Sequence, residues 1–412
     1  RYMSGKSLAE WGATGGPEGG PDRNILQEAL LRLKEIDDSL ETTRRYPDLL
    51  FYRARVLHLL GLVDEAEELY RSCIARQLSE QPARVDYAIL LKEQKRFAEA
   101  ISTVTTGIAT YDKHSVNRIL PVVVAAYDFY ENNKTDNGVW AELASLAKPI
   151  AAKSWAPQEY AYIAALAGYF SKKEDGRELA TLNKLATGQV PISQVLSRYY
   201  GRCLYLIAHE YDRRGKSLSA VKSYEEYIAW AERSNQARSR ELSKSRYTLG
   251  TLLVNVLHSR YKEAAEHLRK VAVEDRDGLD YYYLALGAAL FRATWSRDQP
   301  LVPPSRPTKE MDEQLKEADK VFRLTLEPFA QKAEDNIVEG KDGNSVWRPL
   351  LNSMRALALI SMARWRFPEA LRRWQGLADR VSSLRAKGFD YSDNHNEANL
   401  SLAYLYSDIP KL

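Results

Sequence analysis

The sequence predicts an all-α protein, an α-solenoid built from helical hairpins, and the internal spacing of small residues is the main reason. Ala54 and Ala88 lie 34 positions apart, and so do Ala66 and Ala100. A later segment repeats six positions of the first hairpin at a constant offset of 154. A strand would show a sustained alternation of apolar and polar residues, and no such alternation is present. Because one amphipathic hairpin cannot bury both of its faces, repeats of this kind stack on one another.

Length and composition agree with this class. The chain has 412 residues, more than one compact core normally holds, so two domains or a solenoid are expected. Hydrophobic residues make up 45% and charged residues 28%, as in soluble folded proteins. The mean hydropathy is −0.45, and no run approaches the roughly 18 apolar residues of a membrane span. With 59 basic and 55 acidic residues, the net charge of +4 argues against a nucleic-acid partner.

The N-terminal part is expected to contain a leader and a cap. Residues 1–21 are rich in glycine and are predicted to be a flexible leader, with one helical turn near Leu8–Trp11. Residues 22–46 are predicted to be the N-terminal capping helix, which runs from Asp22 to about Thr42. The Asp22 carboxylate can accept hydrogen bonds from the free amides of the first turn. A cap of this kind gives the end of a solenoid a polar face.

The first hairpin is predicted from Pro47 to Leu78. Its first helix carries one apolar stripe at i, i+4 and i+7, and Gly61 can adopt the left-handed conformation that ends a helix. The inward positions of both helices are small or apolar: Leu50, Ala54, Leu57, Ala66, Tyr70 and Cys73.

The next 34 residues repeat this character. Ala88, Ala100, Val104 and Gly107 stand where the first hairpin has Ala54, Ala66, Tyr70 and Cys73. At this point the sequence resembles the tetratricopeptide repeat (TPR) family, whose units are helix-turn-helix segments of 34 residues. Small residues of that family lie where paired helices touch, and the alanines match this role. The resemblance implies a right-handed α-solenoid of TPR-like helix hairpins.

Further units follow along the chain. Helix pairs with a weaker signature are predicted over residues 115–153 and 157–187, and a clear copy over 201–233. In the clear copy, each of six residues lies 154 positions after its counterpart in the first hairpin: Ala208, Tyr211, Gly215, Ala220, Tyr224 and Tyr227.

The C-terminal part repeats the pattern with one interruption. A unit over 247–273 is followed by a helix from 280, whose partner is delayed to 309. The segment between them contains four prolines, so a Pro-rich extended loop outside the solenoid is predicted at 294–309. The last full unit begins at Leu351, where Ala358 and Ala370 are 12 apart like Ala54 and Ala66. The solenoid is predicted to span 47–407 with about six helix pairs, and residues 408–412 form a C-terminal tail.

The sequence lacks the patterns of an active site. None of the six histidines has a second histidine four residues away on a helix, and none stands in a Cys/His cluster. A phosphate loop, a nucleophile elbow and a dinucleotide fingerprint are also missing. Cys73 and Cys203 belong to different repeats, so two buried thiols are expected rather than a disulfide. We therefore predict a protein that is not an enzyme, with no catalytic residues, no cofactor and no metal.

The resemblance also implies a binding surface, because the first helices of TPR hairpins line a concave groove. The positions one turn around from the packing alanines are Phe51, Arg55, His58, Val85, Ile89, Lys92, Arg202, Tyr205, His209, Arg213, Asn352, Arg355 and Leu359. Of these, the predicted partner-binding residues are Phe51, Arg55, His58, Lys92, Arg202, Tyr205, His209, Arg213 and Arg355. Basic and aromatic side chains alternate among them, which suits an acidic or aromatic peptide. The alternative is that they are ordinary solvated helix positions.

One ligand of the family fits poorly. Some TPR domains hold the acidic carboxyl terminus of heat-shock chaperones with a clamp of two lysines, two asparagines and an arginine. The corresponding positions here are Phe51, Arg55, Val85 and Ile89, without an asparagine pair. A chaperone-tail receptor is therefore disfavoured.

Two classes of function stay open. The first is a non-catalytic scaffold or adaptor that captures a partner polypeptide on the concave face. The second is an accessory protein of a bacterial envelope, secretion or polysaccharide-export machine, which surface Trp and Tyr stacking would favour. The chain begins with Arg1 instead of methionine, so we expect that a preceding segment was removed, and a signal peptide or an N-terminal anchor are both open. Cytoplasmic and periplasmic locations both suit this sequence, and the oligomeric state is undetermined.

Overall fold

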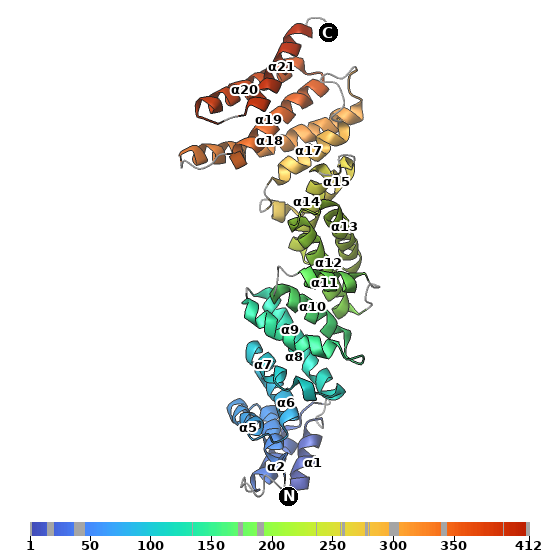
Figure 1. Ribbon diagram of the computed structural model, residues 1–412, viewed down its shortest axis with the longest axis vertical. Coiled ribbons are helices and arrows are strands. Elements are labelled where there is room, and N and C mark those ends of the chain that lie inside the picture. The colour runs from blue at the N-terminus through green and yellow to red at the C-terminus, as the bar shows by residue number, and fades with distance from the viewer. Residues whose placement is uncertain are drawn as a thin grey trace. The chain divides into compact units, whose positions relative to one another are not determined.

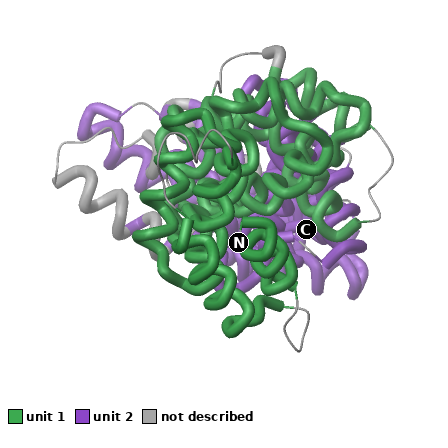
Figure 2. Tube along the Cα trace, turned by 90° about the horizontal axis from the view of Figure 1, so that it is seen from below, with its two compact units in different colours: residues 1–203 green, residues 204–412 purple. Residues whose placement is uncertain are grey.

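The chain folds into helices that pack in successive pairs. The computed structural model describes residues 2–14, 20–36, 46–133, 135–171, 176–187, 193–235, 237–255, 257, 260–276, 279, 281–295, 305–338, 344–389 and 391–408. Regular secondary structure within these ranges is helical and includes no strand (Figure 1). The predicted all-α class is therefore confirmed. The chain divides into two compact units, residues 1–203 and 204–412, and the division falls within helix α12 (Gln194–Arg213) (Figure 2).

Unit 1 begins with two N-terminal helices and continues as hairpins. Its elements are α1 (Tyr2–Gly12), α2 (Arg23–Lys34), α4 (Leu49–Leu60), α5 (Val63–Ala75), α6 (Glu80–Glu93), α7 (Phe97–Thr105), the 3-10 turn η1 (Ile108–Thr110), α8 (Lys113–Asn132), α9 (Asn137–Ala151), α10 (Gln158–Ser171) and α11 (Gly176–Ala186). Helices α4 and α5, α6 and α7, α8 and α9, and α10 and α11 each pack as a pair.

Unit 2 continues in the same way after the last part of α12. Its further elements are α13 (Ser217–Ser234), α14 (Ser239–Asn255), α15 (Tyr261–Arg269), the short α16 (Val273–Arg276), α17 (Tyr282–Thr294), α18 (Lys309–Val338), α19 (Asn344–Ala363), α20 (Phe367–Ala386) and α21 (Ser392–Asp408). Helices α14 and α15, α17 and α18, and α19 and α20 each pack as a pair, which gives seven packed pairs among the described helices of the two units, beside the prediction of about six. Pairs with a weak sequence signature, such as α10 and α11, fold as hairpins like the clear copies.

The predicted register of the TPR-like hairpins is confirmed by burial. Ala54, Ala88, Ala208 and Ala358 have no exposed surface. Their partners 12 positions later, Ala66, Ala100, Ala220 and Ala370, have none either. A methyl group at each of these positions allows the two helices of a hairpin to approach closely, which a longer side chain would prevent.

The same register governs how the first helix of a hairpin ends. Gly61, Lys95, Gly215 and Trp365 occupy equivalent positions, and all four have positive φ, between 57° and 82°. In the first hairpin the amide of Leu62 donates to the carbonyl of Leu57, and the other three hairpins repeat this bond. This is the left-handed helix ending that glycine favours, because a Cβ atom is strained there.

Lys95→Gly is expected to stabilise the protein by about 0.5–1 kcal/mol. Lys95 has φ 61° and is exposed, so the substitution relieves backbone strain without removing a buried contact. The measurement is the free energy of unfolding from urea denaturation followed by circular dichroism. Gly61→Ala is the matched opposite change and should destabilise the protein. Lower stability of Lys95→Gly would show that the lysine makes a compensating contact.

The N-terminal segment differs from the prediction. Instead of one helical turn in a flexible leader, Tyr2–Gly12 forms the full helix α1, which packs on α2 and α4. A Cβ atom on Gly5 would lie 2.9 Å from the side chain of Leu33, so the glycine permits this close approach. Lys6 also forms an ion pair with Asp48 at 2.9 Å. Gly5 and Gly12 therefore serve helix packing, although composition alone suggested a loop.

The capping helix agrees in part with its prediction. The Asp22 carboxylate accepts hydrogen bonds from the amides of Asn24 and Ile25, at 3.0 and 3.2 Å, so it caps α2 as predicted. The helix ends at Lys34, earlier than the predicted Thr42, which lies outside the described residues.

The ends of the Pro-rich segment are held against the solenoid. Trp295, directly after α17, is buried. The carbonyl of Ser305 accepts a hydrogen bond from Trp365 Nε1 at 3.1 Å, and the Arg306 guanidinium lies 5.9 Å from the centre of the Trp365 ring. The flanks that the structure describes thus contact the helices of unit 2. Residues 296–304, the centre of the predicted loop, lie outside the described residues, as do 409–412 of the predicted tail.

Candidate functional site

The predicted cations of unit 1 face carboxylates of neighbouring first helices. Arg55 of α4 lies 3.7 Å from the buried Asp86 of α6, and Arg118 of α8 pairs with the same carboxylate. His58 Nε2 lies 2.9 Å from Glu93 Oε2. These pairs join successive first helices of unit 1, so much of the predicted charge serves the solenoid itself. Sequence reasoning missed them because the partners belong to other hairpins.

Other predicted positions of unit 1 are in the interior. Phe51 and Val85 are buried in the core, so little of either side chain is accessible to a partner. Ile89 and Lys92 are half-buried. The Arg202 guanidinium lies 2.7 Å from Glu131 of α8, and both side chains are largely buried. A charge reversal at Arg202 would therefore place two carboxylates together, and would test stability rather than binding.

The predicted positions on the second part of α12 also have partners within the chain. Tyr205 packs on Tyr227, with ring centres 5.4 Å apart. Burial lowers the pKa of His209, and the nearby Lys244 adds to this effect. Arg213 donates two hydrogen bonds to Glu210 at 3.0 and 2.8 Å. Hydrogen bonding from Arg213, together with that from Arg214, lowers the pKa of Glu210 to about 2.

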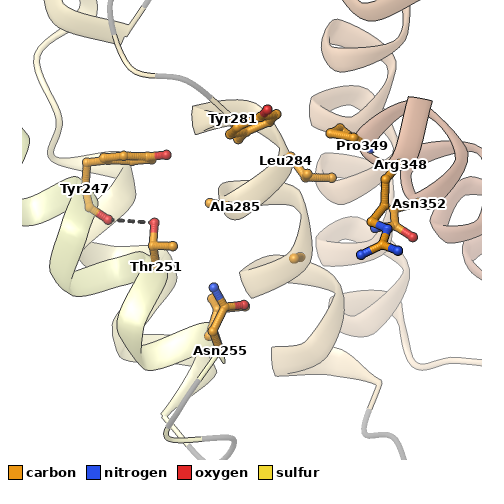
Figure 3. Close-up of a pocket in the computed structure, with 11 residues that line it drawn as sticks. Tyr247, Thr251, Asn255, Tyr281, Leu284, Ala285, Arg348, Pro349 and Asn352 are labelled. Atoms are coloured by element: carbon orange, nitrogen blue, oxygen red, sulfur yellow. Dashed lines mark hydrogen bonds between the residues drawn. The ribbon is translucent and has the colours of Figure 1, made fainter. Parts of the chain in front are cut away.

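A pocket is present where three first helices of unit 2 meet. It has a volume of about 640 Å³ and lies between α14, α17 and α19 (Figure 3). The residues that line it are Tyr247, Thr251, Val254, Asn255, Tyr281, Leu284, Ala285, Ala288, Arg348, Pro349 and Asn352.

A second pocket of about 430 Å³ adjoins the first and shares Val254, Asn255, Leu284, Ala288 and Asn352 with it. Its other lining residues are Tyr261, Phe291, Arg292, Phe322, Arg355, Ala356 and Leu359. We call the two pockets together the unit-2 groove. Arg355 is the predicted partner-binding residue that lies in it, and the predicted positions Asn352 and Leu359 lie there too.

The unit-2 groove is cationic with an apolar floor. Arg292, Arg348 and Arg355 are its charged lining residues, and no carboxylate is among the described residues that line it. Arg355 is paired with Glu397 at 2.6 Å. For Arg348, no carboxylate lies within ion-pair distance in the described part of the chain. Arg348 stands on α19 among the residues that line the pocket (Figure 3).

The polar groups of the groove offer hydrogen bonds to an occupant. Asn255 and Asn352 are exposed amides on α14 and α19, and each offers donors and an acceptor. The Thr251 hydroxyl donates to the carbonyl of Tyr247 at 2.9 Å within α14 (Figure 3). Among the described lining residues there is no carboxylate, imidazole or thiol that could act as a general base or nucleophile.

The sequence contained a partial signal for this site. One face of α19 carries four lining residues at helical spacing: Arg348, Asn352, Arg355 and Leu359. The prediction included the last three of them and left out Arg348, which lies one turn earlier. Tyr247 and Tyr281 were missed, because neither lies one turn from a packing alanine in a clear repeat.

Two other kinds of feature are absent from the part of the chain that the structure describes. This part contains no group of three or more His, Cys, Asp or Glu side chains that could hold a metal ion. None of the helices described here is long and apolar enough to cross a membrane.

Comparisons with known proteins returned similarity to solved structures only. No family model matches the chain, and no curated protein matches it. A structure of Naa15/Naa10 bound to HypK-THB aligns at 15% identity with a TM-score of 0.44, covering 100% of this chain. The chain spans 64% of the length of that chain. The TPR domain of P58(IPK) aligns at 13% identity with a TM-score of 0.26, covering 98% of both chains.

Proposed function

We propose that this protein is a non-catalytic binding module, a scaffold or adaptor that holds an acidic segment of a partner polypeptide in the unit-2 groove. The observation that carries the proposal is a cationic groove, with a pocket of about 640 Å³, whose described lining has three arginines and no carboxylate. Arginine binds carboxylates through paired hydrogen bonds, so such a lining favours an acidic occupant.

The dimensions of the groove suit an extended segment. First helices of adjacent hairpins pack about 8–10 Å apart, so three of them span about 16–20 Å. An extended chain advances about 3.3 Å per residue, and five or six residues would cross the groove. The amides of Asn255 and Asn352 can pair with the backbone of such a segment from two helices, because a side-chain amide has both donors and an acceptor.

Arg348→Glu is expected to weaken binding at least tenfold, about 1.4 kcal/mol. The substitution replaces the groove arginine that has no carboxylate partner among the described residues, so folding should change little. Peptides are selected from a random dodecapeptide phage library on the full chain. Their affinities are then measured as synthetic peptides by fluorescence anisotropy at two salt concentrations. Selected peptides should be acidic, and their affinity should fall as salt rises.

The control is Arg385→Glu, the same charge change on an exposed position of α20 that does not line the groove. It should alter the affinity less than twofold. The proposal is wrong if no peptide is selected, or if selected peptides bind the Arg348→Glu variant as tightly as the original chain.

A further inference from the structure

The lining that α17 contributes to the larger pocket of the unit-2 groove consists of small or aliphatic side chains. Ala285 and Ala288 lie three residues apart on one helix face and form the floor with Leu284. Because the alanines leave the space above them unfilled, the pocket reaches about 640 Å³. A large apolar side chain placed over the two alanines would be buried there, and this burial would contribute to the binding free energy of an occupant.

Two aromatic rings stand beside this hollow. Tyr247 comes from α14, Tyr281 stands directly before α17, and both side chains line the pocket (Figure 3). Tyr281 has φ 64°, a conformation that is uncommon for a residue other than glycine, and 38% of its surface is exposed. Residues with a strained backbone are frequent at ligand sites, where the strained conformation holds a side chain in the orientation that binding requires.

We propose that the partner segment inserts an aromatic side chain over Ala285 and Ala288, beside Tyr247 and Tyr281, with an acidic residue close to it in sequence at Arg348. This inference rests on the proposed function and names the residue type that the groove selects. A ring can pack against tyrosines edge-to-face or offset, which an aliphatic side chain cannot do. Arg348 lies on the α19 side of the pocket, so one short segment can reach both features (Figure 3).

The test uses the peptides selected on the full chain. We expect an aromatic residue within about three positions of an Asp or Glu, and replacing it by alanine should lower the affinity at least tenfold. In the protein, Ala288→Leu fills the hollow and should weaken the same peptides to a similar extent. The matched control is Ala403→Leu, on an exposed position of α21, which should leave the affinity within twofold.

A second pair of variants tests the inference even if the protein does not fold with leucine at position 288. Tyr247→Leu should weaken binding, whereas Tyr247→Phe, which keeps the ring, should retain most of the affinity. Circular dichroism melting curves establish that each variant is folded. Acidic peptides without an aromatic residue, or peptides that bind Ala288→Leu and Tyr247→Leu at full affinity, would overturn the inference. If the aromatic inference fails in this way but Arg348→Glu still weakens binding, the proposed function stands. If the selection yields no binding peptide, the proposed function and the aromatic inference are both overturned.

Discussion

Trp374→Ala is expected to lower the free energy of unfolding by about 3–5 kcal/mol, the largest effect of any substitution considered. Trp374 has no exposed surface and lies in the core cluster of unit 2, with Leu351, Met362 and Leu377 among its members. Its Nε1 donates to the sulfur of Met362 at 3.1 Å. Alanine would leave a cavity between α19, α20 and α21, which rigid helices fill only in part.

Urea denaturation followed by circular dichroism measures this loss. Trp11→Ala serves as the control, because 61% of the Trp11 surface is exposed, and it should cost less than about 1 kcal/mol. A loss below about 1.5 kcal/mol for Trp374→Ala would mean that the surrounding helices collapse into the cavity, or that the core differs from the one described.

Ala208→Leu is expected to destabilise the protein by about 1–3 kcal/mol through overpacking. Ala208 has no exposed surface and occupies the position that Ala54 holds in the first hairpin. Three additional carbon atoms would force the helices apart or push side chains out of their preferred rotamers. The expected readout is a lower denaturation midpoint with an unchanged slope.

Ala98→Leu is the matched control, since the same substitution is made on an exposed position of α7. It should change the stability by less than about 0.5 kcal/mol. Equal midpoints for Ala208→Leu and the original chain would contradict the hairpin register.

The register of the repeats was predictable because it depends on local spacing. Ala54, Ala88, Ala208 and Ala358 were assigned to helix contacts from their offsets, and all four are fully buried. The Asp22 cap was predictable for a similar reason, since the carboxylate bonds amides two and three residues ahead. In contrast, the sequence suggested that Gly5 lies in a loop. The structure shows that a Cβ atom on Gly5 would lie 2.9 Å from the side chain of Leu33, so the glycine permits close packing.

The candidate site was predicted less well than the fold. Helical spacing placed Asn352 and Arg355 on the groove face, and both line the unit-2 groove. The same spacing selected Arg55, His58 and Arg202, each of which faces a carboxylate of another hairpin. Spacing along one helix shows which face a side chain occupies, but it does not show what stands opposite.

The sequence by itself therefore determined the all-α class, the register of the clear TPR-like hairpins and their buried alanine positions, because each follows from spacing within a hairpin or between repeats. Only the tertiary structure decided which cations are neutralised and where a groove opens. Arg202 and its partner Glu131 are 71 positions apart, and Tyr247 and Arg348 of one pocket are 101 apart. Stacking brings such residues together, and the size of each side chain at the junction of three helices then determines whether the space is filled or left as a site.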